Sequence, residues 1–345
     1  MLLIFGTTVG AGVFSLPIAL QNAGAIPFIL IAVVVAYLTA QINILYRRVI
    51  EHTGEKHQLP GYAGLILGRR IGRLAVLLLL FATAGALLAY LILGGGFLSN
   101  LLGTQPEVGS FILAATAAVL LFVDGHKLES IDGFLTIAKI GLIIVLGAIG
   151  LEALAAHPSV PLMGPQPFLA YGTILFAMTG FSIMPELHKT GDERQTIALS
   201  QILIGVLYVF FAFSLYPLTS GGGAIMMDSV FKRVIFDIAG LCAVFTPYLL
   251  LGVIGVDIFV RDLGLSVRSA KTLMVCIPLL LFALGLQSFT KVLSLTGGVF
   301  LGGIAIIIAS MYAKTFPRKN IILVNVIRLV FIAGLLYEIV RFFAY

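Results

Sequence analysis

Charged side chains are scarce in this chain. Of its 345 residues, 10% are Asp, Glu, Lys or Arg and 60% are hydrophobic, whereas a soluble domain carries about 25% charged residues. The first charged residue is Arg47, so the stretch before it is long enough to cross a bilayer twice at about 20 residues a pass. The composition predicts an integral membrane protein surrounded by lipid. In such a protein the net charge of +6 is no sign of a nucleic acid partner, because basic residues must be assigned loop by loop.

Cysteine is also rare. Cys242 and Cys276 both lie in apolar segments, which excludes a disulfide framework and a cysteine-based metal site. A membrane enzyme would need converging nucleophilic, acid–base or metal-binding groups at membrane depth. The histidines fall in expected loops without ligand spacing, at His52, His57, His126, His157 and His188. We therefore expect no cofactor, no metal site and no enzymatic activity.

Apolar stretches separated by polar loops predict an all-α membrane protein of eleven spans. They lie at residues 1–21, 25–46, 74–98, 109–123, 133–151, 168–186, 197–217, 235–257, 271–287, 292–312 and 321–340. With a cytoplasmic amino terminus, fifteen of the 21 basic residues fall in internal loops, four outside and two within spans, in agreement with the positive-inside rule. This predicts a multi-pass plasma membrane protein whose carboxyl terminus is outside. No basic region precedes the first stretch, so we expect no removable signal peptide, and the loop at 47–73 is expected to hold a small interfacial helix.

Glycine and proline interrupt the first and sixth stretches. The first contains GTTVGAGVFSLP from Gly6 to Pro17, and the sixth contains FAMTGFSIMPE from Phe176 to Glu186. No water satisfies freed backbone groups at membrane depth, so such a break survives where it lines a cavity or packs on protein. The two breaks are five spans apart, an odd number, which gives them opposite topologies. The pattern predicts an inverted five-plus-five repeat, with repeats at residues 1–151 and 168–312 and an additional helix at 321–342.

Two breaks that face each other would suit a zwitterion. Amides at the amino end of the first break could hold a carboxylate, at Gly10, Ala11 and Gly12. Carbonyls at the second break could hold an ammonium group, at Ala177, Thr179 and Gly180. A substrate side chain could pack on nearby aromatic residues, namely Phe176, Phe181 and, further away in sequence, Tyr90. The simpler alternative is that Gly and Pro are common in membrane helices.

No isolated acidic residue at mid-span offers itself to a cationic side chain, so the expected substrate is a neutral amino acid. Charged pairs at helical spacing are interpreted as structural pairs near span ends, at Asp257 with Arg261 and Glu338 with Arg341.

Three segments carry a resemblance to a known family. They are GTTVGAGVFSLPIALQNAG from Gly6 to Gly24, GFSIMPEL from Gly180 to Leu187 and TPYLLLGV from Thr246 to Val253. They resemble the first, sixth and eighth spans of the amino acid/auxin permease family, which includes bacterial aromatic amino acid permeases and belongs to the amino acid–polyamine–organocation superfamily. The likeness extends over nearly the whole chain in span count and order. It implies the inverted-repeat fold shared with sodium-coupled neurotransmitter transporters, an amino acid substrate and uptake by alternating access.

Lys139 is the candidate for ion coupling. It is expected about 10 Å deep in the fifth span at 1.5 Å per residue, where a charge is costly. The resemblance implies that it stands where sodium-coupled relatives bind a cation, beside carbonyls of Gly6 and Val9 and the hydroxyl of Thr246. Pro247 replaces the second hydroxyl residue that sodium-coupled relatives often have.

We therefore expect proton-coupled symport with Lys139 as the protonation switch, since desolvation lets a lysine lose its proton. The alternatives for Lys139 are a permanent charge that bridges helices and a side chain that snorkels to the inner surface. A sodium-coupled symporter and a non-transporting amino acid sensor of the same fold remain alternative functions, and we expect no obligatory protein partner.

Overall fold

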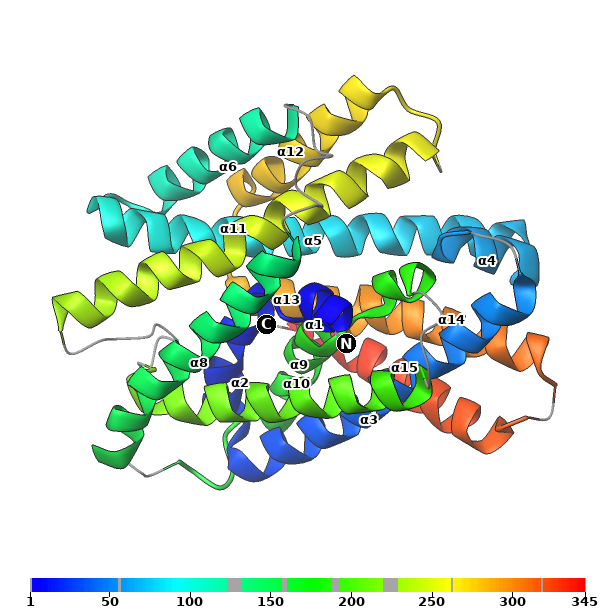
Figure 1. Ribbon diagram of the computed structural model, residues 1–345, viewed down its shortest axis with the longest axis horizontal. Coiled ribbons are helices and arrows are strands. Elements are labelled where there is room, and N and C mark those ends of the chain that lie inside the picture. The colour runs from blue at the N-terminus through cyan, green and yellow to red at the C-terminus, as the bar shows by residue number, and fades with distance from the viewer. Residues whose placement is uncertain are drawn as a thin grey trace.

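The computed structural model describes residues 2–54, 57–122, 132–156, 160–187, 193–219, 229–261, 263–317 and 319–344. Every secondary-structure element in these ranges is a helix (Figure 1). Seven stretches are long and apolar enough to cross a bilayer: Ala25–Thr53, Arg69–Leu102, Pro167–Pro185, Glu193–Leu218, Val230–Arg261, Phe289–Thr315 and Ile321–Ala344. Shorter apolar helices lie at Pro106–Phe122 and Ile140–Ala156. The multi-pass membrane protein is thus supported, while the eleven spans and the five-plus-five repeat stay predictions.

The first half of the chain begins with a segment in three pieces. These are α1 (Leu2–Thr8), the 3-10 helix η1 (Ala11–Ser15) and α2 (Leu16–Ala23). Then follow α3 (Ala25–Thr53), α4 (Leu59–Leu67), α5 (Arg69–Leu102), α6 (Pro106–Phe122) and α8 (Asp132–Ala156). The short helix α4 lies in the loop that was predicted to contain one.

The second half also begins with an interrupted segment. It consists of η2 (Pro167–Leu169), α9 (Ala170–Met178) and η3 (Phe181–Glu186). Then follow α10 (Glu193–Leu215), η4 (Tyr216–Leu218), α11 (Val230–Arg261) and α12 (Val267–Ala283). The last helices are α13 (Phe289–Leu295), the π-helical turn η5 (Thr296–Leu301), α14 (Gly302–Thr315) and α15 (Ile321–Ala344).

Several helices run beyond the charge-free stretches of the sequence. α3 continues to Thr53 and α5 begins at Arg69, because a helix can leave the membrane and solvate its charged side chains. Glycines at positive φ set the limits: Gly54 at +73° ends α3 and Gly68 at +102° precedes α5. α12 ends earlier than its apolar stretch, at Ala283, two residues before Gly285 at φ +94°.

The interrupted segments lie at the centre of the bundle. α9 has eight buried residues out of nine, as expected of a helix that is apolar on all sides. It packs against α3, η1, α2, α13 and η5. In Figure 1, α5 crosses the molecule between α6 and α12 on one side and α13 on the other. This arrangement encloses both interruptions among long helices.

Candidate functional site

The first interruption lies between α1 and η1. α1 ends at Thr8, and Gly10 has an extended backbone with φ −145° and ψ −160°. The 3-10 helix that begins at Ala11 then continues into α2 through Pro17. Because η1 starts here, the amides of Ala11 and Gly12 point out of its amino end. The predicted discontinuity of the first segment is present.

The second interruption lies between α9 and η3. Thr179 has an extended backbone with φ −78° and ψ 127°, and Gly180 follows at φ −137° and ψ 32°. The 3-10 helix that follows contains Pro185, which cannot donate a backbone hydrogen bond. The predicted discontinuity of the sixth segment is therefore present too.

The two interruptions are in direct contact. A β-carbon built at Gly12 would lie 3.0 Å from the α-carbon of Ala177 and 3.1 Å from the ring of Phe176. A β-carbon built at Gly180 would lie 2.6 Å from the hydroxyl oxygen of Thr8. Glycine at both positions therefore allows the two backbones to pack closely, each break against the other segment.

Tyr208 of α10 connects the two breaks through hydrogen bonds. Its hydroxyl donates to the carbonyl oxygens of Thr8 at 2.9 Å and Ala177 at 3.2 Å. The same hydroxyl has a backbone hydrogen bond with Gly10. Tyr208 is 1% exposed, so these bonds form away from solvent. Sequence reasoning missed this residue.

Gln201 lies two turns before Tyr208 on α10 and supports the second break. Its amide nitrogen donates to the carbonyl of Met178 at 2.8 Å and to the hydroxyl of Thr39 at 2.9 Å. The hydroxyl of Thr179 donates to the carbonyl of Leu175 at 2.6 Å. Side chains thus satisfy carbonyls that the end of α9 frees, which is the requirement for a broken helix within a membrane. The seven-residue spacing of Gln201 and Tyr208 places them on one face of α10, but the sequence has no signal of which elements that face meets.

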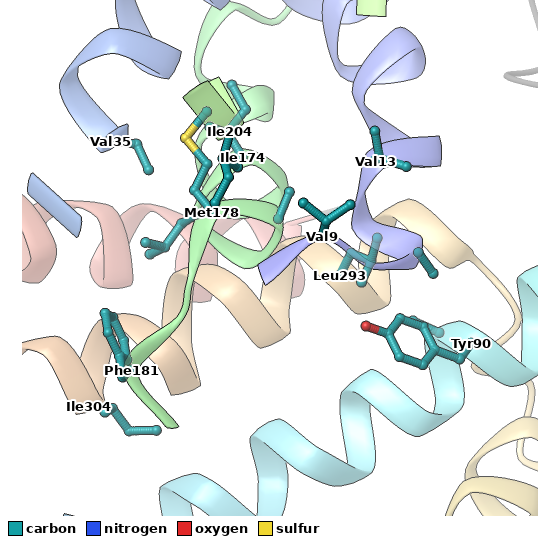
Figure 2. Packing of buried hydrophobic residues seen from close by; sticks show 14 of the residues in the cluster. Val9, Val13, Val35, Tyr90, Ile174, Met178, Phe181, Ile204, Leu293 and Ile304 are labelled. Carbon is teal, nitrogen blue, oxygen red and sulfur yellow. The ribbon is translucent and has the colours of Figure 1, made fainter. Parts of the chain in front are cut away.

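The aromatic residues near the breaks divide into two places. Tyr90 of α5 and Phe176 of α9 pack edge to face with ring centroids 6.3 Å apart. A β-carbon built at Gly10 would lie 3.1 Å from the Tyr90 hydroxyl, which points toward the first break (Figure 2). Phe181 is the first residue of η3, directly after Gly180 at the second break, and is buried. Tyr90 and Phe176 therefore lie beside the first break, while Phe181 begins the segment after the second break.

A cluster of four aromatic rings lies beyond the first break, on the side of α2. Phe14 of η1 is at its centre, with ring centroids 5.3 Å from Phe97, 5.7 Å from Phe211 and 5.9 Å from Phe236. All four rings are buried, at most 6% exposed. They join η1 to α5, α10 and α11, and so close this side of the breaks.

The structure describes only some of the residues predicted for ion coupling. The side chains of Lys139 and Thr246 lie outside the described part of the structure, although their helices α8 and α11 are described. α8 packs against both α1 and α11, which is the neighbourhood that the prediction requires. Val9 is 1% exposed, and its amide donates to the carbonyl of Phe5. The roles of Gly6, Val9, Lys139 and Thr246 stay predictions.

A membrane-spanning helical bundle with two broken segments crossing at its centre is the architecture of a secondary transporter. The profile of the tryptophan/tyrosine permease family matches residues 1–216, and the chain belongs to this family. The expected resemblance to bacterial aromatic amino acid permeases agrees with this result. The wider placement in the amino acid/auxin permease family and its superfamily stays a prediction. No curated protein sequence matches the chain.

Two solved structures of LeuT-fold transporters are similar in fold. The manganese transporter of Eremococcus coleocola, in complex with an aromatic bis-isothiourea substituted compound, superposes with a TM-score of 0.65 at 14% identity, over 99% of this chain and 86% of that one. MhsT in complex with L-phenylalanine superposes with a TM-score of 0.62 at 18% identity, over 98% of this chain and 97% of that one. At these identities the likeness shows the fold alone.

Proposed function

We propose that this chain is a secondary active transporter that takes up neutral aromatic amino acids, tryptophan and tyrosine foremost, by alternating access across the plasma membrane. Membership of the tryptophan/tyrosine permease family supports the substrate class. The direct contact between the two helix breaks, joined by Tyr208, is the structural observation that supports a central site. We place the amino terminus in the cytoplasm and the carboxyl terminus outside, on the distribution of basic residues.

In the proposed site the substrate lies between the two breaks. Its carboxylate binds at the amino end of η1, at Gly10, Ala11 and Gly12, where backbone amides and the helix dipole favour an anion. Its ammonium group binds near the carboxyl end of α9, around Ala177, Thr179 and Gly180. Carbonyl oxygens have two lone pairs, so a carbonyl already bonded to Tyr208 can still accept from a substrate.

The substrate ring packs on aromatic side chains near the breaks. Tyr90 and Phe176 are placed for an edge-to-face contact with an indole or phenol. Phe181, which was predicted alongside them, stays a candidate for this surface, because it directly follows Gly180 at the second break.

Coupling to protons is the driving force that we propose. Lys139 of α8 alternates between charged and neutral forms as access changes, in a pocket shared with carbonyls of Gly6 and Val9 and the hydroxyl of Thr246. The packing of α8 against α1 and α11 supports this assignment. Sodium coupling is the alternative, and Pro247 in place of a second hydroxyl residue argues against it.

Purified protein in proteoliposomes tests the function. Uptake of labelled tryptophan or tyrosine, and competition by the other amino acids, should identify an aromatic substrate. Accumulation should follow an inward pH gradient and ignore a sodium gradient; the reverse result would establish the sodium alternative. Lys139→Ala should abolish pH-driven accumulation, whereas Lys291→Ala, at an exposed lysine, should not. Tight binding of tryptophan without net flux would instead establish a sensor.

A further inference from the structure

α15 carries a buried acidic residue on an otherwise peripheral helix. Only 22% of the residues in its most apolar stretch are buried inside the protein, the lowest share among the seven candidate spans. Its buried residues form one inward stripe: Val324, Ile327, Phe331 and Glu338. An apolar residue at position 338 would continue the stripe, yet the residue there is a glutamate that is 3% exposed. A carboxylate in such a place is costly, so its presence needs a functional reason.

Two glycines make the space that Glu338 occupies. A β-carbon built at Gly298 of η5 would lie 2.3 Å from Cγ of Glu338. A β-carbon built at Gly172 of α9 would lie 2.7 Å from its Oε1 atom. The glutamate therefore lies in a gap between α15, η5 and α9 that larger residues would close.

Three donors hold the Glu338 carboxylate. The Ser294 hydroxyl donates to Oε1 at 2.7 Å, Arg341 donates to Oε2 at 3.3 Å, and the backbone amide of Gly172 donates as well. Arg341 also donates to Ser294 Oγ at 3.1 Å. The ion pair expected between Glu338 and Arg341 is present, but it is one part of a buried cluster rather than a solvated pair at a span end.

The cluster connects α15 to the half-helix that ends at the candidate site. Gly172 is in the first turns of α9, and Met178 at the second break lies six residues further, about 9 Å along the helix. A bond to the Gly172 amide therefore fixes the position of a short, stiff element whose other end forms the site. If α9 moves, this bond must break.

A small cavity, about the size of one water molecule, lies next to the cluster. It is lined by Asn22, Thr173, Thr290, Ser294 and Arg341 together with apolar side chains that include Ile18 and Ala19. The lining comes from α2, α9, α13 and α15, which are the elements around the predicted outer half of the interrupted segments. The Ser294 and Arg341 members of the cluster therefore face a gap on this predicted outer side.

Few other titratable or charged groups face Glu338. Tyr171 of α9 interacts with it electrostatically, and the Tyr171 hydroxyl is buried with no hydrogen-bond partner in the described part of the chain. Arg341 faces it from α15 itself. The neighbours of Glu338 on α13 and η5 are Ser294 and Gly298, neither of which carries a charge. Lys291, which is also on α13, is exposed.

We propose that Glu338 is a proton-binding residue that links protonation to the position of α9. The three donors stabilise the ionised carboxylate in the arrangement seen here. A proton taken from water forms an O–H bond on the carboxyl group, removes its charge and weakens these three bonds. Protonation therefore favours any arrangement in which the amino end of α9 has moved away. The proposal rests on the transport function proposed above.

Glu338→Gln tests the proposal, because glutamine keeps the shape and cannot take up the proton. Tryptophan uptake into proteoliposomes should depend on external pH in the parent protein and lose that dependence in the variant, while exchange of internal for external tryptophan persists. Glu152→Gln, which removes an exposed carboxylate paired with Lys232, is the matched control and should keep the parent pH profile. Ser294→Ala leaves the carboxyl group in place and should shift the midpoint of the pH profile without abolishing it.

Infrared spectroscopy of the purified protein gives a readout that does not require transport. The parent protein should show one titrating carboxylic C=O stretching band, at the frequency of a buried carboxyl group, that is missing from Glu338→Gln, while the bands of the other Asp and Glu residues persist. An unchanged pH profile or an unchanged band in Glu338→Gln would overturn the proposal, as would a parent uptake that is independent of pH. A titrating band in a protein that neither binds nor moves aromatic amino acids would support the proton site and reject the proposed substrate.

Discussion

Gly12 lies against the backbone of Ala177, so closely that a β-carbon at position 12 would be 3.0 Å from the α-carbon of Ala177. This contact joins two segments that are 165 positions apart in the chain. It brings the amino end of η1 to the carboxyl end of α9, where opposite partial charges of the two helix ends meet. The proposed site depends on this approach.

Gly12→Ala should therefore impair both transport and stability. The neighbouring atoms include backbone, which yields little, so we expect a loss of about 1 to 3 kcal/mol in stability. Uptake of tryptophan should fall by about ten- to a hundredfold, because displacement of a site by a fraction of an ångström is costly. Gly96→Ala is the control, since no atom lies within 4 Å of its β-carbon position. Equal uptake by the two variants would contradict the close approach.

Tyr208→Phe should destabilise the protein through the two breaks. It leaves the carbonyl groups of Thr8 and Ala177 without their buried donor, which costs about 1 to 3 kcal/mol. Tyr46→Phe is a matched control, because Tyr46 is equally buried and its hydroxyl has no partner among the described residues. Thermal unfolding in detergent should show a lower midpoint for the first variant and no loss for the second. A lower midpoint for Tyr46→Phe as well would mean that the hydroxyl bonds are not the cause.

Glu193→Gln should weaken the predicted inner side of the bundle. Arg47 of α3 donates to both carboxylate oxygens of Glu193, at 2.5 and 3.0 Å, and to the carbonyl of Met184 in η3 at 3.3 Å. Removing one charge from this nearly buried pair should cost about 3 kcal/mol. Glu152→Gln, at a side chain that is 69% exposed, should cost less than about 1 kcal/mol. Urea or thermal unfolding of the two variants would measure the difference.

Phe176→Leu should change substrate preference. If the aromatic substrate packs on Phe176 and Tyr90, the substitution should raise the KM for tryptophan by about two- to tenfold, the range of one aromatic pair contact. The inhibition of tryptophan uptake by leucine should change little. Phe181→Leu should change the preference less, because Phe181 has no ring contact with Tyr90 or Phe176 among the described residues. A stronger effect of Phe181→Leu would move the ring-binding surface to the inner side.

Much of the candidate site could be predicted from local sequence. The non-helical residues Gly10, Thr179 and Gly180 fall in the predicted breaks, since glycine and proline weaken a helix wherever it packs. Tyr208 and Gln201 could not be predicted in the same way. Their role depends on which face of α10 meets α9 and α3, and nothing local in the sequence sets that register.

Burial is the property that changed the interpretation of Glu338. A pair three residues apart at a helix end has the pattern of a weak surface contact, and the sequence has no sign of what covers it. The side chain is covered at Gly172 and Gly298, which are 166 and 40 positions away along the chain. Small residues are common at helix interfaces, so the role of these two glycines can be assigned only once the side chain that packs against them is known.

The sequence by itself determined that this protein is a helical membrane protein and where its first and sixth segments break, because composition and backbone propensity act locally. The tertiary structure alone decided that the breaks meet, that Tyr208 joins them, that Tyr90 lies beside the first break, and that Glu338 is enclosed beside α9. These features depend on contacts between helices distant in the chain, where packing and hydrogen-bond satisfaction in a medium without water select the arrangement.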